Sequence, residues 1–113
     1  MSDAEIASRV FARYRRYYND EVQGCCPLIA DEIQRAIGGE LVAGELVFCG
    51  GRRTHWWVEK DGTAFDPMGD WMFAPEDHMH REEAHRDRAI FEQILPKYER
   101  WRIPAESESR SDE

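Results

Sequence analysis

Residues 54–67, THWWVEKDGTAFDP, decide the fold predicted for this chain, because they describe two strands joined by a tight turn. Apolar and aromatic side chains lie on both sides of Asp61 and Gly62. An Asp-Gly pair between two such runs is a strong short-range signal for a hairpin. The stretch therefore predicts antiparallel strands at residues 54–59 and 63–66.

The length of the turn also fixes which side chains share a face of the hairpin. With a two-residue turn, Trp57 pairs with Asp66, and His55 lies two residues along the same face. His55 and Asp66 are then diagonal neighbours, at a distance where a carboxylate can hold an imidazole N–H. A three-residue loop would place them on opposite faces unless a bulge restored the register. Trp56 and Val58 would face the core.

Two helices are expected before this hairpin. Apolar side chains recur at helical spacing over residues 3–18, which predicts an amphipathic helix, and a polar loop is expected to follow through Gly24. A second helix is predicted from Pro27, because proline suits the first position of a helix, where its missing N–H is not needed. Gly38 and the glycine after it supply the stop.

The remaining segments complete the sheet and add a third helix. Residues 41–49 predict a further strand, and residues 69–77 an irregular loop that packs down as a buried segment. A polar helix is predicted to start near Pro75 or Glu76 and to continue over residues 86–101, where Pro96 must introduce a kink or a break. The predicted fold class is α+β, with a central helix packed on a small antiparallel sheet and flanking N- and C-terminal helices.

The composition predicts one domain over residues 1–103, followed at residues 104–113 by an acidic, low-complexity tail that we expect to be disordered. Fifteen basic and 23 acidic residues give a formal charge of −8, which disfavours nucleic acid or an anionic membrane as the main partner. No apolar run approaches the about 20 residues that a membrane span needs.

The N-terminus and the cysteines bear on the cellular compartment in which we expect the protein. The first ten residues, MSDAEIASRV, lack the basic-then-apolar order of a signal peptide, so a cytoplasmic location is expected. Three cysteines cannot all pair, and a reducing compartment disfavours disulfides, so free thiols are expected. Cys49, at the end of an apolar strand, is expected to be a core residue.

Cys26 is the residue that first points to a chemistry. It lies directly before Pro27, at or beside the N-cap of the predicted second helix. A helix N-terminus stabilises a thiolate, because unpaired N–H groups, here those of Leu28 and Ile29, and the helix dipole interact with the negative sulfur. Cys25 lies one residue farther out and remains a competitor for the same role.

A thiol, an imidazole and a carboxylate in this order are the parts of a cysteine nucleophile, its base and the group that orients the base. The sequence predicts Cys26, His55 and Asp66 for these three roles. The Cys26 backbone N–H, with Gln23 as the nearby side-chain amide, is the expected oxyanion donor. Trp57 either shields the histidine–aspartate bond from water or lines a substrate groove. Taken singly, each of the three proposed catalytic residues also has a structural interpretation. Cys26 could be a small buried apolar residue, His55 a hydrogen-bonded polar residue of a strand, and Asp66 the opening residue of a turn.

With these residues in place, the chain resembles the papain-like superfamily, and most closely its compact, transglutaminase-core-like branch. The likeness covers roughly residues 22–70 and consists of three short motifs in order. They are Gly-x-Cys-x-x-x-Ala at Gly24, Cys26 and Ala30, His-x-Trp-Val-Glu at His55, Trp57, Val58 and Glu59, and Asp-Pro at Asp66 and Pro67.

The resemblance implies a minimal papain-like core and thiol-mediated acyl chemistry on a peptide or protein substrate. Hydrolysis of a peptide, isopeptide or amide bond is favoured over transfer to an amine. Two alternatives stay open, a transglutaminase or acyltransferase, and a catalytically silent scaffold that serves as an acidic protein-interaction module. The chain departs from the family at Pro27, where the peptidases commonly carry an aromatic residue.

No cofactor is expected, and the sequence makes no prediction of oligomeric state. His78, His80 and His85 invite a metal interpretation, but their spacing is not the i, i+4 arrangement that places two ligands on one helix face. A solvated helix surface is the better interpretation, so no metal site is predicted.

Overall fold

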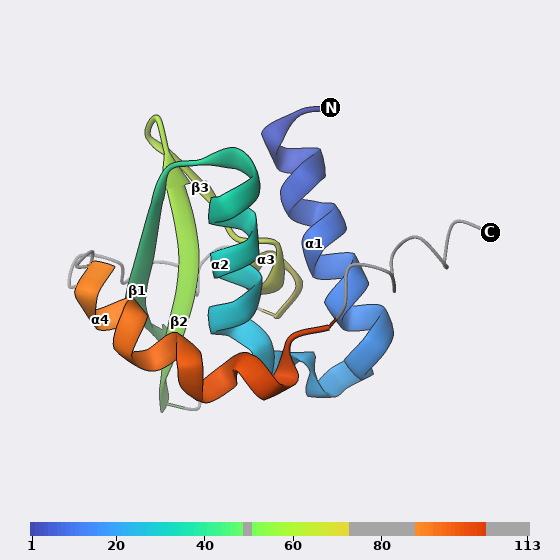
Figure 1. Ribbon diagram of the computed structural model, residues 1–113, viewed down its shortest axis with the longest axis vertical. Helices are drawn as coiled ribbons and strands as arrows, with labels where there is room; N and C mark the ends of the chain where they lie inside the picture. The colour runs from blue at the N-terminus through green and yellow to red at the C-terminus, as the bar shows by residue number, and fades with distance from the viewer. Residues whose placement is uncertain (49–50, 73–87, 104–113) are drawn as a thin grey trace.

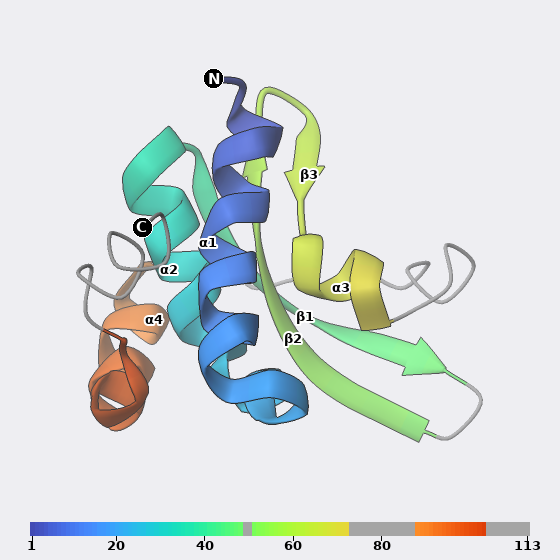
Figure 2. The ribbon, with the colours of Figure 1, turned by 90° about the vertical axis from the view of Figure 1, so that its right-hand side faces the viewer.

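The computed structural model describes residues 1–48, 51–72 and 88–103, which form an α+β fold as predicted. In Figures 1 and 2 a central helix lies between a small antiparallel sheet and a long N-terminal helix. The elements in chain order are α1 (Asp3–Tyr18), the 3-10 helix η1 (Asn19–Cys25), α2 (Cys26–Ile37), β1 (Glu40–Phe48), β2 (Gly51–Lys60), β3 (Thr63–Phe65), α3 (Pro67–Met72), α4 (Arg88–Ile94) and the 3-10 helix η3 (Leu95–Trp101).

The N-terminal helix α1 has the predicted bounds, and its first turn is capped by side chains. Ser2 accepts a hydrogen bond from the Glu5 N–H at 3.1 Å, and the Glu5 carboxylate accepts one from the Ser2 N–H at 3.3 Å. This capping box satisfies two backbone donors that the helix itself cannot pair.

The segment after α1 is a 3-10 helix, so the prediction of a loop through Gly24 is wrong. Val22 and Cys25 are both buried in η1. Their spacing of three residues matches the three residues per turn of this helix, which places both side chains on one face. Burial of that face explains why a polar stretch becomes helical.

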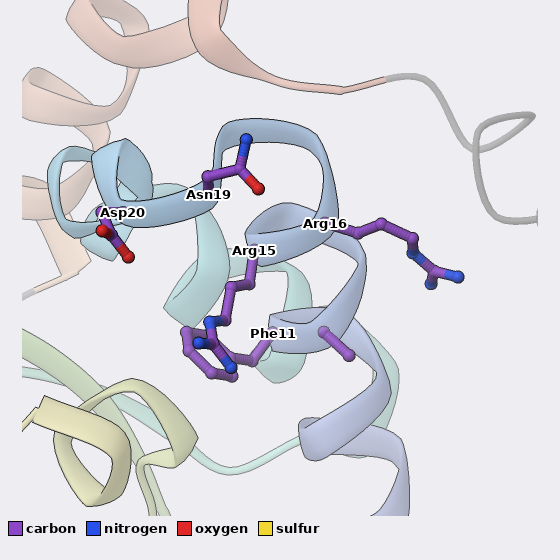
Figure 3. Close-up of a pocket in the computed structure, with 6 residues that line it drawn as sticks. Phe11, Arg15, Arg16, Asn19 and Asp20 are labelled. Carbon is purple, nitrogen blue, oxygen red and sulfur yellow. The ribbon is translucent and has the colours of Figure 1, made fainter.

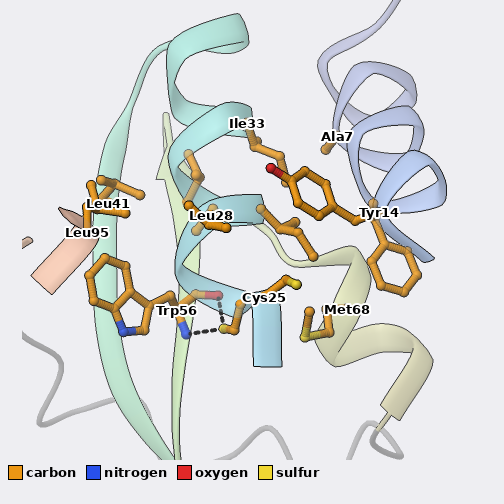
Figure 4. Packing of buried hydrophobic residues seen from close by; sticks show 14 of the residues in the cluster. Ala7, Tyr14, Cys25, Leu28, Ile33, Leu41, Trp56, Met68 and Leu95 are labelled. Atoms are coloured by element: carbon orange, nitrogen blue, oxygen red, sulfur yellow. Dashed lines mark hydrogen bonds between the residues drawn. The ribbon is translucent and has the colours of Figure 1, made fainter. Parts of the chain in front are cut away.

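The central helix α2 carries the apolar stripe that holds the fold together. Leu28 and Ile33 are almost fully buried, between Tyr14 of α1 on one side and Leu41 of β1 on the other (Figure 4). The helix begins at Cys26, one residue before the proline, with Cys25 as its N-cap. Cys26 is thus the first residue of the helix rather than the cap.

The sheet has the strand order β1-β2-β3 and is antiparallel throughout. Lys60 pairs with Thr63, so the hairpin turn contains two residues, as predicted. Asp61 and Gly62 both have positive φ, 51° and 79°, which is the conformation of a type I′ turn. The parity that places His55 and Asp66 on one face is therefore confirmed.

The second strand is longer than expected. Its pairing with β1 runs out to Gly51 opposite Phe48, so β2 begins three residues before the predicted start at Thr54. The Gly-Arg-Arg segment at residues 51–53, which lies outside the predicted strands, therefore belongs to β2, because pairing with β1 satisfies its backbone groups. Cys49, predicted as a core residue, lies outside the described residues.

Two further segments differ in detail from the sequence interpretation. Residues 67–72 form the helix α3, not an irregular loop, and Trp71 and Met72 pack partly buried against the core. The C-terminal helix breaks at Pro96, where α4 gives way to η3, as the missing N–H requires. The predictions for residues 73–87, including the three histidines, and for the tail at 104–113 lie outside the described residues.

A partly buried charged cluster ties the C-terminal segment to α1 and α2. Arg102 donates to the buried carboxylate of Asp31 at 3.1 Å, while Glu32 accepts hydrogen bonds from Arg13 and Tyr14. Burial and the neighbouring Glu32 carboxylate raise the pKa of Tyr14, which therefore stays neutral as a donor. These contacts fix the helix whose first residue is Cys26.

Candidate active site

The structure brings Cys26, His55 and Asp66 together in one chain of contacts. The sulfur of Cys26, at the start of α2, lies 3.1 Å from Nδ1 of His55 on β2. On the other side of the ring, Nε2 of His55 lies 2.6 Å from Oδ1 of Asp66, which follows β3. The three residues are 8%, 3% and 5% exposed, so the contacts form in a largely water-free environment.

The hairpin register explains how the histidine meets the aspartate. Continuing the β2–β3 pairing by one step from Val58 and Phe65 places Asp66 opposite Trp57, diagonal to His55. The Trp57 ring stacks beside the His55 ring, with centroids 5.9 Å apart and an angle of 25° between the planes. Trp57 is 1% exposed, which agrees with a shielding role for its ring.

A backbone donor that the sequence did not reveal also reaches the sulfur. The N–H of Trp56 donates to Cys26 Sγ at 2.9 Å, and the Trp56 carbonyl oxygen lies 3.4 Å from the same sulfur (dashed in Figure 4). The sequence instead predicts the helix N–H groups of Leu28 and Ile29 in this role. A hydrogen bond from an N–H stabilises a thiolate.

The early end of β3 explains why the Trp56 backbone is free to bind a sulfur. Two steps beyond Val58 and Phe65, the register would place Pro67 opposite Trp56. Proline has no N–H to give to a neighbouring strand, and Pro67 instead begins α3. The Trp56 N–H therefore donates to the sulfur of Cys26 and not to a further residue of β3. The Asp-Pro pair is thus the sequence signal that marks this donor.

Asp66 is held by the first turn of α3 as well as by the histidine. Its Oδ1 accepts a hydrogen bond from the Gly69 N–H at 3.0 Å, and its backbone carbonyl accepts one from the Asp70 N–H at 3.0 Å. The aspartate therefore caps a short helix, and this fixes the position of the carboxylate that contacts His55.

The electrostatics favour a protonated histidine. Burial by itself opposes a charge on His55, but the negative sulfur of Cys26 and the hydrogen bond with Asp66 outweigh it and raise the pKa of His55 to about 10. At neutral pH the ring is then an imidazolium, and it lies between the sulfur of Cys26 and the carboxyl group of Asp66. A positive ring beside a sulfur favours the thiolate, the form in which a cysteine acts as a nucleophile.

The geometry separates the two neighbouring cysteines. Cys26 contacts His55, whereas Cys25 is 2% exposed and belongs to the apolar core (Figure 4). Burial, followed by the negative charge of Cys26, raises the pKa of Cys25 to about 11. A thiol with so high a pKa is a poor nucleophile at neutral pH.

The expected oxyanion donors lie near the sulfur along the chain. Gln23 is a half-buried residue of η1, three positions before Cys26. The backbone N–H of Cys26 stands at the junction of η1 and α2. Their role as donors stays a prediction.

Little space adjoins the sulfur. The cavity that Cys26 lines has a volume of about 10 Å³, and Trp56, Trp57 and Met68 are among its walls. Such a volume is close to the minimum for one water molecule. A hollow of about 490 Å³ lies elsewhere, at the C-terminal end of α1, where Phe11 and Arg15 contribute to its lining (Figure 3).

The described residues contain no group of three or more histidine, cysteine, aspartate or glutamate side chains placed to hold a metal ion. Within the same part of the chain, no helix is both long and apolar enough to cross a membrane. Comparisons with protein-family models, with curated proteins and with solved structures found no match to this chain.

Proposed function

We propose that this protein is a thiol-dependent hydrolase that cleaves a peptide, isopeptide or amide bond through Cys26, His55 and Asp66. The observation that carries the proposal is the continuous contact from the Cys26 sulfur through both ring nitrogens of His55 to the Asp66 carboxylate. The resemblance of the three motifs to the compact papain-like branch supports the same chemistry.

In the proposed reaction each of the three side chains has its own step. The Cys26 thiolate attacks the carbonyl carbon and forms a C–S bond, while the carbonyl π electrons move to oxygen. When the tetrahedral intermediate collapses, the C–N bond breaks and His55 gives its proton to the leaving amine. His55 then takes a proton from water, and the resulting hydroxide displaces the sulfur as a carboxylic acid forms. Asp66 keeps the ring oriented throughout.

Several donors would stabilise the charges that appear during these steps. The Trp56 N–H stabilises the thiolate, and the Cys26 N–H with Gln23 is the proposed pair for the oxyanion. Water is the proposed acceptor, because it is always present, whereas transfer to an amine needs an acceptor site. A reducing cytoplasmic compartment would keep the nucleophile as a free thiol.

A second candidate function is a silent papain-like scaffold that acts as an acidic interaction module. The observation that favours it is the enclosure of the sulfur, since Cys26 is 8% exposed and its cavity holds about 10 Å³. A substrate could reach such a thiol only after the walls around it move. Turnover therefore requires that this enclosure opens.

Alkylation by iodoacetamide at about pH 6 separates the two functions, because an ordinary thiol is protonated there. The hydrolase proposal predicts one fast-reacting thiol, located at Cys26 by mass spectrometry of the labelled peptides. His55→Ala should slow it by about tenfold or more, since the thiolate loses its counter-ion. Cys25→Ser is the matched control and should leave the rate unchanged.

Equal and slow labelling of all three cysteines would reject the hydrolase and support the silent scaffold. Labelling in urea gives the rate of each unfolded thiol and so shows whether the slow reaction reflects burial. Fast labelling at Cys25 instead of Cys26 would mean that the nucleophile is misassigned.

A further inference from the structure

Gly69 is a glycine inside a helix, where this residue is normally unfavourable. It lies in α3, and its φ is outside the left-handed region, so its backbone conformation is open to any residue. A glycine inside a helix costs about 0.5–1 kcal/mol relative to alanine. The reason for a glycine at this position must therefore lie in the space around it.

The space around Gly69 is filled by one side chain. A Cβ placed on Gly69 would lie 2.7 Å from Cγ and 2.9 Å from Oδ1 of Asp66, and it would also clash with Oδ2. The three nearest heavy atoms thus all belong to one carboxyl group. Real Cβ atoms do not approach other heavy atoms within 3.0 Å, so any side chain at this position must displace the carboxylate.

The carboxylate has little freedom to give way. Oδ1 of Asp66 is bonded at once to the Gly69 N–H at 3.0 Å and to His55 Nε2 at 2.6 Å. Asp66 is also 5% exposed, so in the native structure its carboxylate is held largely away from water. A shift large enough to clear a methyl group would break or lengthen the contact with His55.

We propose that Gly69 is a positioning residue of the candidate site, because its missing side chain lets one Asp66 oxygen cap α3 and orient His55 together. The inference rests on the proposed function for its catalytic meaning. The geometry on which it depends, from Gly69 through Asp66 to His55, can be measured without any substrate.

The test compares three glycine-to-alanine variants. Gly69→Ala meets the Asp66 carboxylate, Gly39→Ala meets the Glu59 backbone at 2.6 Å and does not touch that carboxylate, and Gly24→Ala meets no atom within 4 Å. NMR titration of the His55 ring, assigned by its loss in His55→Asn, reads the contact with Asp66. Gly69→Ala should lower the midpoint by about one pH unit or more.

The controls separate positioning from general destabilisation. Gly39→Ala should reduce the urea midpoint of unfolding and leave the His55 titration at the wild-type value, and Gly24→Ala should change neither. A wild-type His55 midpoint in Gly69→Ala would overturn the proposal.

A double-mutant cycle covers the case in which Gly69→Ala is too unstable to titrate. In the Asp66→Ala background the carboxylate is gone, so adding Gly69→Ala should cost no further stability. Urea unfolding measures the free energy of unfolding of each variant in the cycle. A loss that persists in that background would overturn the proposal. If wild-type Cys26 shows no selective alkylation, the hydrolase fails, while the titration and the cycle still decide the role of Gly69.

Discussion

The backbone N–H of Trp56 donates a 2.9 Å hydrogen bond to the sulfur of Cys26, so the central strand of the sheet supports the start of the central helix. The neighbouring His55 contacts the same sulfur through Nδ1. Two consecutive residues of β2 thus stabilise one sulfur, one through its backbone and one through its side chain. This arrangement requires β3 to end before it reaches Trp56.

The first prediction concerns the turn that sets the hairpin register. Gly62 has a φ of 79°, so Gly62→Ala should reduce the free energy of unfolding by about 1–2 kcal/mol, the cost of a left-handed conformation for an L-residue. Asp61→Asn is the matched control and should leave stability nearly unchanged, because asparagine also suits the type I′ turn. Urea unfolding at neutral pH measures both variants.

Inserting one glycine after Gly62 tests the link from register to site. The insertion changes the parity of the hairpin, which moves Asp66 to the face opposite His55 unless a bulge forms. The His55 ring should then titrate at a lower pH than in the wild type. An unchanged titration would show that the register does not control the contact.

The second prediction is a pH dependence that arises from His55. Its folded pKa of about 10 lies above the value of about 6.5 for an unfolded histidine, so the native state binds the extra proton. The stabilisation by protonated His55 is therefore fully present below about pH 6.5 and is lost as the pH rises through about 10. In Cys26→Ala the ring should lose its proton at a lower pH, because the negative sulfur is absent.

Urea unfolding between about pH 8.5 and 10 measures this linkage, because the pH there lies above the pKa of an unfolded histidine and approaches that of folded His55. The wild type should lose up to about 1.4 kcal/mol per pH unit relative to the double variant Cys26→Ala/His55→Gln, which lacks both groups. Parallel curves for the two proteins would contradict the raised pKa.

The third prediction concerns the ring that covers the histidine. Trp57 is 1% exposed, so Trp57→Ala should cost about 3–5 kcal/mol of stability and let water reach the bond between His55 and Asp66. Trp57→Phe keeps an aromatic ring beside His55 and loses part of the ring volume together with the indole N–H that donates to Glu59 at 2.9 Å. The phenylalanine variant should therefore retain the wild-type rate of Cys26 alkylation.

Exchange of the His55 ring protons with water reads the shielding directly. Exchange should be fast in Trp57→Ala and slow in the wild type and in Trp57→Phe. Equal exchange in all three would remove the shielding role and leave Trp57 as a packing residue.

The sequence predicts the parts of the site that depend on local rules. Asp61 and Gly62 determine the turn and thus the face shared by His55 and Asp66, and Pro27 marks the start of the helix beside Cys26. Each of these follows from conformations that one or two residues impose on the backbone. Together with the order of thiol, imidazole and carboxylate along the chain, they predict which three side chains share one site.

The remaining contacts could not be predicted because they depend on where elements end in three dimensions. The Trp56 N–H reaches the sulfur only because Pro67 stops β3, and a pattern of side chains does not show which backbone groups stay unpaired. Gly69 matters through the volume of Asp66, which is likewise a tertiary property. The helix η1 formed in a polar stretch because its buried face packs on the core.

The most direct test of the central claim is trapping of an acyl-enzyme on Cys26. The protein is mixed with p-nitrophenyl acetate, a small activated ester, quenched in acid and analysed by peptide mass spectrometry. The account predicts one acetyl group on Cys26 that forms rapidly and is then lost to water, with much slower formation in His55→Ala. No acetylation of Cys26, or acetylation that is equally fast in His55→Ala, would contradict it.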